Sequence, residues 1–116
     1  MDIEVLRRAP LFASLGDEVF ATLTEELTEV DLSRGASVFR EGDQGDRLYF
    51  IVSGKIKLGR TSSDGRENLI AVLGPGELFG EMALFDPHPR NATATAVSET
   101  RLAGLSHENM RKAMAA

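Results

Sequence analysis

The chain has 116 residues and a formal net charge of −5, from 13 basic and 18 acidic residues, and it contains no cysteine. Its length suits one domain, and the scattered basic residues argue against DNA binding by this chain alone. The absence of cysteine excludes disulfides, thiolate metal sites and cysteine-ligated iron–sulfur clusters. The longest apolar run, residues 48–52, is far shorter than the ~20 residues of a membrane span. Since the acidic start also lacks a secretory signal, we expect a cytoplasmic protein without a membrane partner.

Residues 1–28 predict N-terminal helices. Asp2 can cap a short helix that Pro10 ends. A capping-box spacing begins at Ser14 and predicts the start of a second helix. Its apolar side chains recur at helical spacing and form one stripe: Val19, Phe20, Leu23 and Leu27. We expect this stripe to pack on the core.

Residues 29–105 predict a sheet structure of short strands. Segments with β-branched and aromatic residues alternate with glycine turns, such as residues 62–65 and 74–76. The predicted strands are residues 30–32, 38–39, 48–52, 56–58, 69–73, 94–97 and 102–105. Strands this short, at spacings near ten residues, favour an antiparallel β-roll or jelly roll.

The last segment, residues 106–116, predicts the start of C-terminal helices. Ser106 can cap a helix in which Met110 and Met114 lie at helical spacing. The helix stops at Ala116 without a C-terminal cap, so we expect the protein to continue. The predicted fold class is therefore mainly β with flanking α, a β-roll between N-terminal helices and a C-terminal helix start.

Residues 76–93 interrupt the strand pattern and carry the chemistry. Residues 81–84 are strong helix formers, but Pro87 and Pro89 leave room for about one turn. The start of such a short helix offers free backbone N–H groups to an anion, which Gly80 allows to approach closely. Arg90, returned to the same place by the loop, adds a charged, forked donor. This combination predicts a site for one phosphate.

Glu81 beside a phosphate site is explained by a ligand that also carries a hydroxyl group. A hydrogen bond to a charged group contributes about 1.5–3 kcal/mol, enough to select a ribose over a deoxyribose. Ala92 is small and lets the ligand lie against the backbone. The residues also allow a plainer interpretation, in which Glu81 and Arg90 form a salt bridge that fixes a surface loop.

Four stretches of the chain resemble a known family. Residues 79–84 and 89–93 resemble the phosphate-binding cassette of cyclic nucleotide-binding domains. Residues 39–54 and 64–69 are similar to a glycine-bounded strand pair and hairpin of the same family. The similarity runs from about residue 5 to the end and is greatest to sensor domains of bacterial catabolite-activator and nitrate-fumarate regulators. It implies one sensor domain, residues 1–116, with a β-roll at 29–105 and the cassette at 79–93.

The resemblance also implies roles for individual residues. Arg90 pairs with the cyclic phosphate, Glu81 accepts a hydrogen bond from the ribose 2′-hydroxyl, and Gly80 lies against the sugar. Asn91 stands where the family often has a small or hydroxyl residue, and its amide can donate to the phosphate. Four apolar residues fall where the family lines the base and sugar, although each could equally be plain β-roll core. The implied ligand-binding residues are Leu58, Ile70, Ala71, Leu73, Gly80, Glu81, Met82, Ala83, Arg90, Asn91 and Ala92.

The implied function is the sensing of a cyclic nucleotide, cyclic AMP in preference to cyclic GMP, with no cofactor required. In the family, a long helix that covers the base and forms a homodimer follows, and then a winged helix-turn-helix domain that binds DNA. Both would lie beyond this chain, so we expect the homodimer in the full-length protein and a monomer for this chain alone. An alternative is the same fold without a nucleotide, serving in packing and dimerisation or sensing another anionic metabolite. An enzyme of the cupin type would need clustered metal ligands, which His88 and His107 do not supply.

Overall fold

The computed structural model describes residues 6–8, 10–80 and 87–115. Within them, antiparallel strands build two four-stranded sheets and one two-stranded ladder. The first sheet has the order β1 (Thr28–Leu32), β10 (Thr100–Ser106), β4 (Arg47–Ser53) and β7 (Leu78–Phe79). The second has the order β2 (Ser37–Phe39), β9 (Thr93–Ala96), β5 (Ile56–Thr61) and β6 (Glu67–Leu73). The ladder joins β3 (Gln44–Gly45) and β8 (His88–Pro89).

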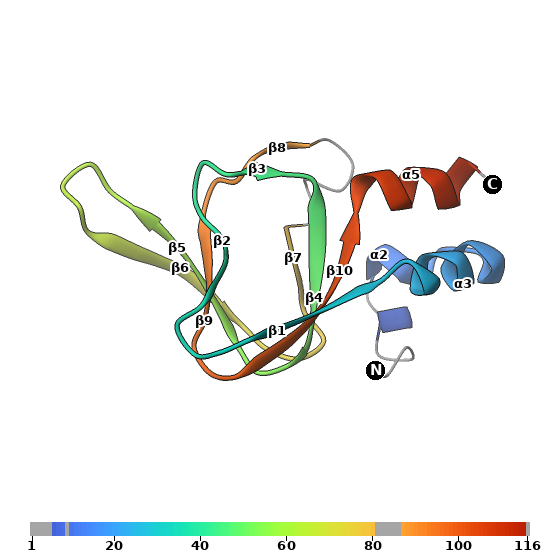
Figure 1. Ribbon diagram of the computed structural model, residues 1–116, viewed down its shortest axis with the longest axis horizontal. Helices are drawn as coiled ribbons and strands as arrows, with labels where there is room; N and C mark the ends of the chain where they lie inside the picture. The colour runs from blue at the N-terminus through green and yellow to red at the C-terminus, as the bar shows by residue number, and fades with distance from the viewer. Residues whose placement is uncertain (1–5, 9, 81–86, 116) are drawn as a thin grey trace.

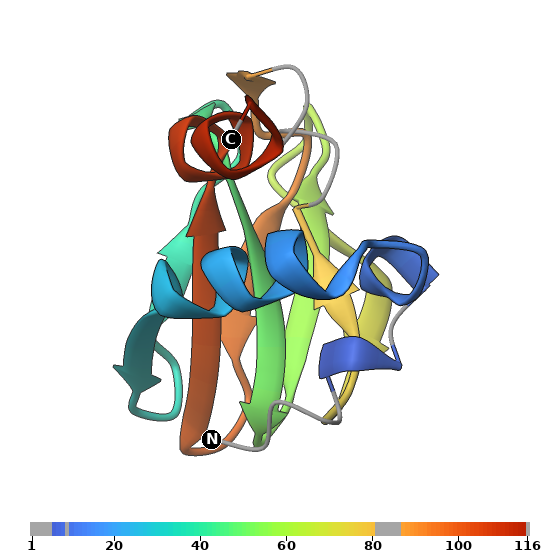
Figure 2. The ribbon, with the colours of Figure 1, turned by 90° about the vertical axis from the view of Figure 1, so that its right-hand side faces the viewer.

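The two sheets pack against each other, and helices cover the outer face of the first sheet. Figure 1 shows α2 (Pro10–Ala13), α3 (Asp17–Glu25) and α5 (His107–Ala115) together on one side, while the β5–β6 hairpin projects from the other. In Figure 2, α3 crosses in front of β4 and β10, with α5 above it. This arrangement confirms the predicted class, mainly β with flanking α.

Strand β4 divides its side chains between two cores, as the period of two in a strand requires. Leu48 and Phe50 lie in the core between sheet and helices, where they join Met110 of α5. Tyr49 and Ile51 face the core between the two sheets. A segment that reads as one apolar run is therefore buried on both faces, the pattern of a strand covered on each side.

The seven predicted strands are confirmed as β1, β2, β4, β5, β6, β9 and β10. The turn at residues 62–65 joins β5 to β6 as expected, with the Gly65 N–H donating to the Ser62 carbonyl at 2.9 Å. The cap of the last helix is also confirmed, because the Asn109 N–H donates to the Ser106 Oγ at 3.1 Å.

The predicted capping box at Ser14 is wrong. Helix α3 begins at Asp17, and its N-cap residue is Gly16, which makes no side-chain cap. The reason is tertiary: the Arg7 guanidinium donates to the Leu15 carbonyl at 2.8 Å and to the Asp17 carboxylate at 3.0 Å, which fixes the turn between α2 and α3. Pro10 opens α2, because the first helical position has no need of an N–H group. The Asp2 cap lies outside the described residues.

Candidate functional site

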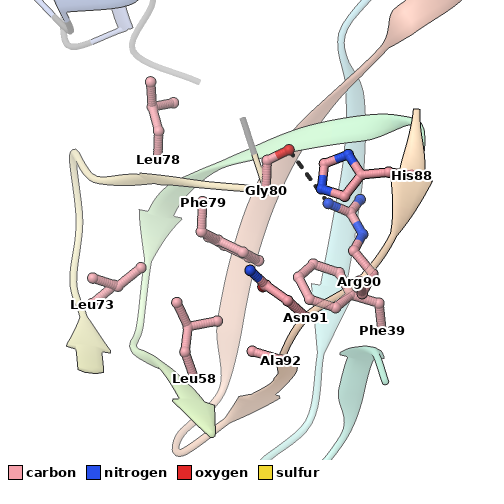
Figure 3. Close-up of a pocket in the computed structure, with 10 residues that line it drawn as sticks. All are labelled: Phe39, Leu58, Leu73, Leu78, Phe79, Gly80, His88, Arg90, Asn91 and Ala92. Atoms are coloured by element: carbon pink, nitrogen blue, oxygen red, sulfur yellow. Dashed lines mark hydrogen bonds between the residues drawn. The ribbon is translucent and has the colours of Figure 1, made fainter. Parts of the chain in front are cut away.

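A pocket of about 350 Å³ opens beside the two-stranded ladder, and its volume is within the range of small-molecule sites. Its walls come from β2, β5, β6, β7, β8 and the segment that leads into β9. Figure 3 shows the lining residues, which are Phe39, Leu58, Leu73, Leu78, Phe79, Gly80, His88, Arg90, Asn91 and Ala92. The polar end holds Arg90, and the apolar end holds Leu58 and Leu73.

The Arg90 side chain is buried, with 8% of the residue exposed. Its Nη2 donates to the Arg47 carbonyl at 2.6 Å, and its Nη1 to the Gly80 carbonyl at 3.3 Å. The guanidinium carbon lies 4.1 Å from the centre of the Phe39 ring, a cation–π contact. Three parts of the chain therefore hold one guanidinium at the edge of the pocket.

Two glycines give this guanidinium its space. A Cβ atom on Gly45 would lie 2.4 Å from the Arg90 Nε, and one on Gly80 would lie 2.7 Å from the Arg90 Nη1. Gly80 also has a φ of +75°, a conformation that residues with a side chain rarely adopt. Both positions therefore favour glycine because of the way in which Arg90 packs.

The described groups that contact the Arg90 guanidinium are mainly neutral. Among the described residues, the ion pairs shorter than 4.0 Å do not include Arg90. Burial lowers the pKa of Arg90, and the nearby Tyr49 and Asp46 act in the opposite direction. A guanidinium keeps its proton in proteins, so the pocket contains a full positive charge, and its two side-chain hydrogen bonds to described residues go to carbonyls. Such a site attracts an anion.

The opposite end of the pocket is apolar. Leu58 of β5 and Leu73 of β6 come from neighbouring strands of one hairpin, and Leu78 closes the same side. Ala92 is buried at 6% exposure and lies between this end and Arg90. A ligand that joins a negative charge to a flat apolar group matches this arrangement.

The structure brings six of the sequence-predicted site residues into one pocket: Leu58, Leu73, Gly80, Arg90, Asn91 and Ala92. Glu81, Met82 and Ala83 lie outside the described residues, so their roles and the Glu81–Arg90 salt bridge stay predictions. Ile70 is 51% exposed, and neither it nor Ala71 is part of the pocket lining.

Some lining residues were not predicted as site residues. They are Phe39, Leu78, Phe79 and His88. Phe39 and Phe79 pack with Tyr49 in an aromatic cluster, with ring centres 5.3–6.1 Å apart. Their apolar character is typical of core residues, and only the pairing of distant strands shows that they also reach the pocket. The sequence could have identified His88 as a site residue, since it stands two positions before Arg90.

The described part of the chain has neither a metal-binding cluster nor a membrane-spanning helix. It contains no group of three or more His, Cys, Asp or Glu side chains that could hold a metal ion. None of its helices is long and apolar enough to cross a membrane.

Comparison with known proteins identifies the family. The family model of the cyclic nucleotide-binding domain matches residues 29–116. The CRP-like cAMP-activated global transcriptional regulator of Mycobacterium tuberculosis is 46% identical over 108 residues, which are 93% of this chain and 48% of that protein. This chain thus spans about half the length of that relative.

Solved structures agree with this match. The N-terminal domain of a transcriptional regulator from Streptomyces coelicolor is 55% identical and superposes with a TM-score of 0.89, covering 96% of this chain and 78% of that one. The regulatory domain of Toxoplasma gondii PKA, crystallised with cAMP, is 34% identical with a TM-score of 0.88, covering 95% of this chain and 42% of that one. The chain therefore belongs to the family of cyclic nucleotide-binding domains.

Proposed function

We propose that this chain binds cyclic AMP, in preference to cyclic GMP, as the sensor domain of a bacterial transcription regulator. The observation that carries the proposal is the buried Arg90, which two carbonyls and the Phe39 ring hold at the edge of a pocket. Enclosing a charge is costly unless a counter-charge or hydrogen bonds compensate it. A bound cyclic phosphate would supply that counter-charge.

The rest of the ligand fits the same pocket. With the phosphate at Arg90, the sugar would pass Gly80 and Ala92, and the base would reach Leu58 and Leu73. We assign the sugar hydroxyl to Glu81, and the phosphate also to the backbone N–H groups of the segment that Glu81 begins. The names of two similar proteins support the choice of cyclic AMP, because one is described as cAMP-activated and the other was crystallised with cAMP.

For the whole protein, we propose that cyclic AMP binding controls DNA binding. The M. tuberculosis relative is a transcriptional regulator about twice as long as this chain. A long dimerisation helix and a DNA-binding domain would occupy the additional length. The whole protein would then be a cytoplasmic homodimer. We assign residues 1–116 to the sensor alone, and we assign it no enzymatic activity.

The test is a titration of the chain with cyclic AMP and with cyclic GMP, followed by amide NMR and calorimetry. We expect cyclic AMP to bind more tightly and to shift the amide signals of residues 80–83 and of Asn91. Two variants of Arg90 sharpen the result. Arg90→Ala should abolish binding while the fold persists, and Arg90→Lys should bind weakly, because lysine keeps the charge but loses the fork.

The matched control is Arg101→Ala, which removes an exposed arginine whose Nε lies 3.0 Å from an Asp31 carboxylate oxygen, away from the pocket. It should bind like the wild type. The absence of any shift at millimolar nucleotide would reject the sensor function and favour a packing and dimerisation role. If Arg90→Ala unfolded the chain, the structural role of the Glu81–Arg90 salt bridge would gain support instead.

A further inference from the structure

His88 and Arg90 lie side by side in the pocket for a reason that is visible in the sequence. His88 begins β8 and Arg90 directly follows this strand, and alternate side chains of extended backbone point to the same face. Pro87 and Pro89 flank His88 and restrict the backbone there. Figure 3 shows the imidazole beside the guanidinium, at the Gly80 end of the pocket.

The two side chains are fixed by the same backbone ladder. His88 is half-buried and lies opposite Gly45 in the β3–β8 pair. The Arg90 N–H donates to the Asp43 carbonyl at 2.7 Å, and the Arg90 carbonyl accepts from the Gly42 N–H at 2.8 Å. His88 therefore keeps its place relative to Arg90, and an anion held by Arg90 would also approach the imidazole.

Charged residues of both signs lie around His88 in the described part of the chain. The residues opposite it on β3, Gln44 and Gly45, are uncharged. Arg90 is its neighbour in the pocket, and Arg47 and Asp46 follow directly after β3.

Further carboxylates stand close by in the sequence, with Asp43 directly before β3 and Glu81 and Asp86 before β8. The Asp43 carboxylate accepts from the Arg40 N–H at 2.9 Å, and Glu81 and Asp86 lie outside the described residues. An anion held by Arg90 would place a negative charge beside the imidazole, and such a charge favours the protonated form of a histidine.

We propose that His88 is a second cationic group of this binding site, and that its protonated imidazole pairs with the same phosphate that Arg90 holds. Binding of the ligand would then take up a proton, and the affinity would rise as the pH falls through the range in which histidine changes charge. A cyclic phosphodiester keeps one negative charge throughout this range, so the ligand itself contributes no such dependence. The inference rests on the proposed nucleotide-binding function.

The experiment measures the dissociation constant of cyclic AMP at pH 6, 7 and 8 at constant ionic strength. For the wild type we expect binding roughly three- to tenfold tighter at pH 6 than at pH 8. Calorimetry in two buffers of different ionisation enthalpy should show proton uptake on binding. His88→Gln keeps a polar side chain without the titratable charge, and it should bind equally at pH 6 and pH 8.

The chain provides its own control, because His107 is the only other histidine. It begins α5 and is not part of the pocket lining, so His107→Gln should keep the wild-type pH dependence. If His88→Gln failed to fold, the imidazole proton signals of the wild type, assigned with His107→Gln, would give the answer. The His88 signal should then titrate at higher pH with ligand than without it.

The outcomes separate this inference from the function on which it rests. No binding of cyclic AMP at any pH would reject the nucleotide-binding function itself. Binding that does not change with pH, or a pH dependence that persists in His88→Gln, would overturn the role of His88 and leave the nucleotide-binding function standing.

Discussion

The substitution Gly45→Ala separates the ligand site from the fold. Gly45 is buried in the β3–β8 ladder, and its backbone does not need positive φ, so alanine is tolerated by the main chain. The new Cβ would lie 2.4 Å from Nε and 2.8 Å from Cδ and Cζ of Arg90. Since real Cβ contacts are longer, the Arg90 side chain has to move.

The movement of Arg90 should weaken ligand binding while the domain stays folded. Overpacking one methyl group costs about 1–3 kcal/mol of unfolding free energy, which a domain stable by about 5–15 kcal/mol withstands. A displaced guanidinium loses a hydrogen bond to a charged phosphate, worth about 1.5–3 kcal/mol. We therefore expect Gly45→Ala to bind cyclic AMP roughly 10- to 100-fold more weakly, measured by isothermal titration calorimetry, with a cooperative urea transition retained.

The control is Gly74→Ala, since a Cβ on Gly74 would meet nothing within 4 Å and its backbone likewise avoids positive φ. It should match the wild type in affinity. An affinity of Gly45→Ala within about twofold of the wild type would refute the reasoning, because it would show that the exact place of the guanidinium does not govern ligand binding.

Three other substitutions test single contacts. Phe39→Leu removes the ring under the Arg90 guanidinium; at about 0.5–2 kcal/mol for such a contact, calorimetry should show roughly two- to thirtyfold weaker binding. Thr100→Val removes a buried hydroxyl that bonds to the Lys55 backbone N–H and carbonyl, both at 3.2 Å. Urea unfolding should show a loss of about 1–3 kcal/mol, while an unchanged stability would argue against these bonds. Ser106→Ala removes the cap of α5 and should lower the unfolding free energy by about 1 kcal/mol without changing the affinity; an affinity change would contradict a purely structural role.

The sequence predicted the long strands because their signals are local. Apolar residues bounded by glycine turns identify β4 and the β5–β6 hairpin without knowledge of their partners. The two-residue strands β3, β7 and β8 show no periodicity, since a period of two needs several residues to appear. These short strands nevertheless place Phe79 and His88 in the pocket lining and Gly45 against the Arg90 side chain.

The residues of the candidate site likewise divide into those with a local sequence signal and those placed by contacts between distant segments. Gly80 and Arg90 were predicted because a glycine before helix formers and an arginine after prolines are local signals for an anion. The place of Phe39 beneath Arg90 depends on a contact between segments far apart in the sequence. The misplaced cap at Ser14 has the same origin, because the side chain that fixes this turn, Arg7, comes from outside it.

Strand β4 contacts both the pocket side and the helix side of the first sheet. Tyr49 stacks on Phe79, which lines the pocket, with ring centres 5.3 Å apart. The next residue, Phe50, packs on the opposite face in the core that includes Met110 of α5. A ligand that repositions Arg90 over Phe39 acts on this aromatic cluster, and a densely packed strand transmits such a shift to its other face. We therefore expect β4 to contribute to any influence of the ligand on α5, together with β10, which has Leu102 in one core and Ala103 in the other and leads directly into α5.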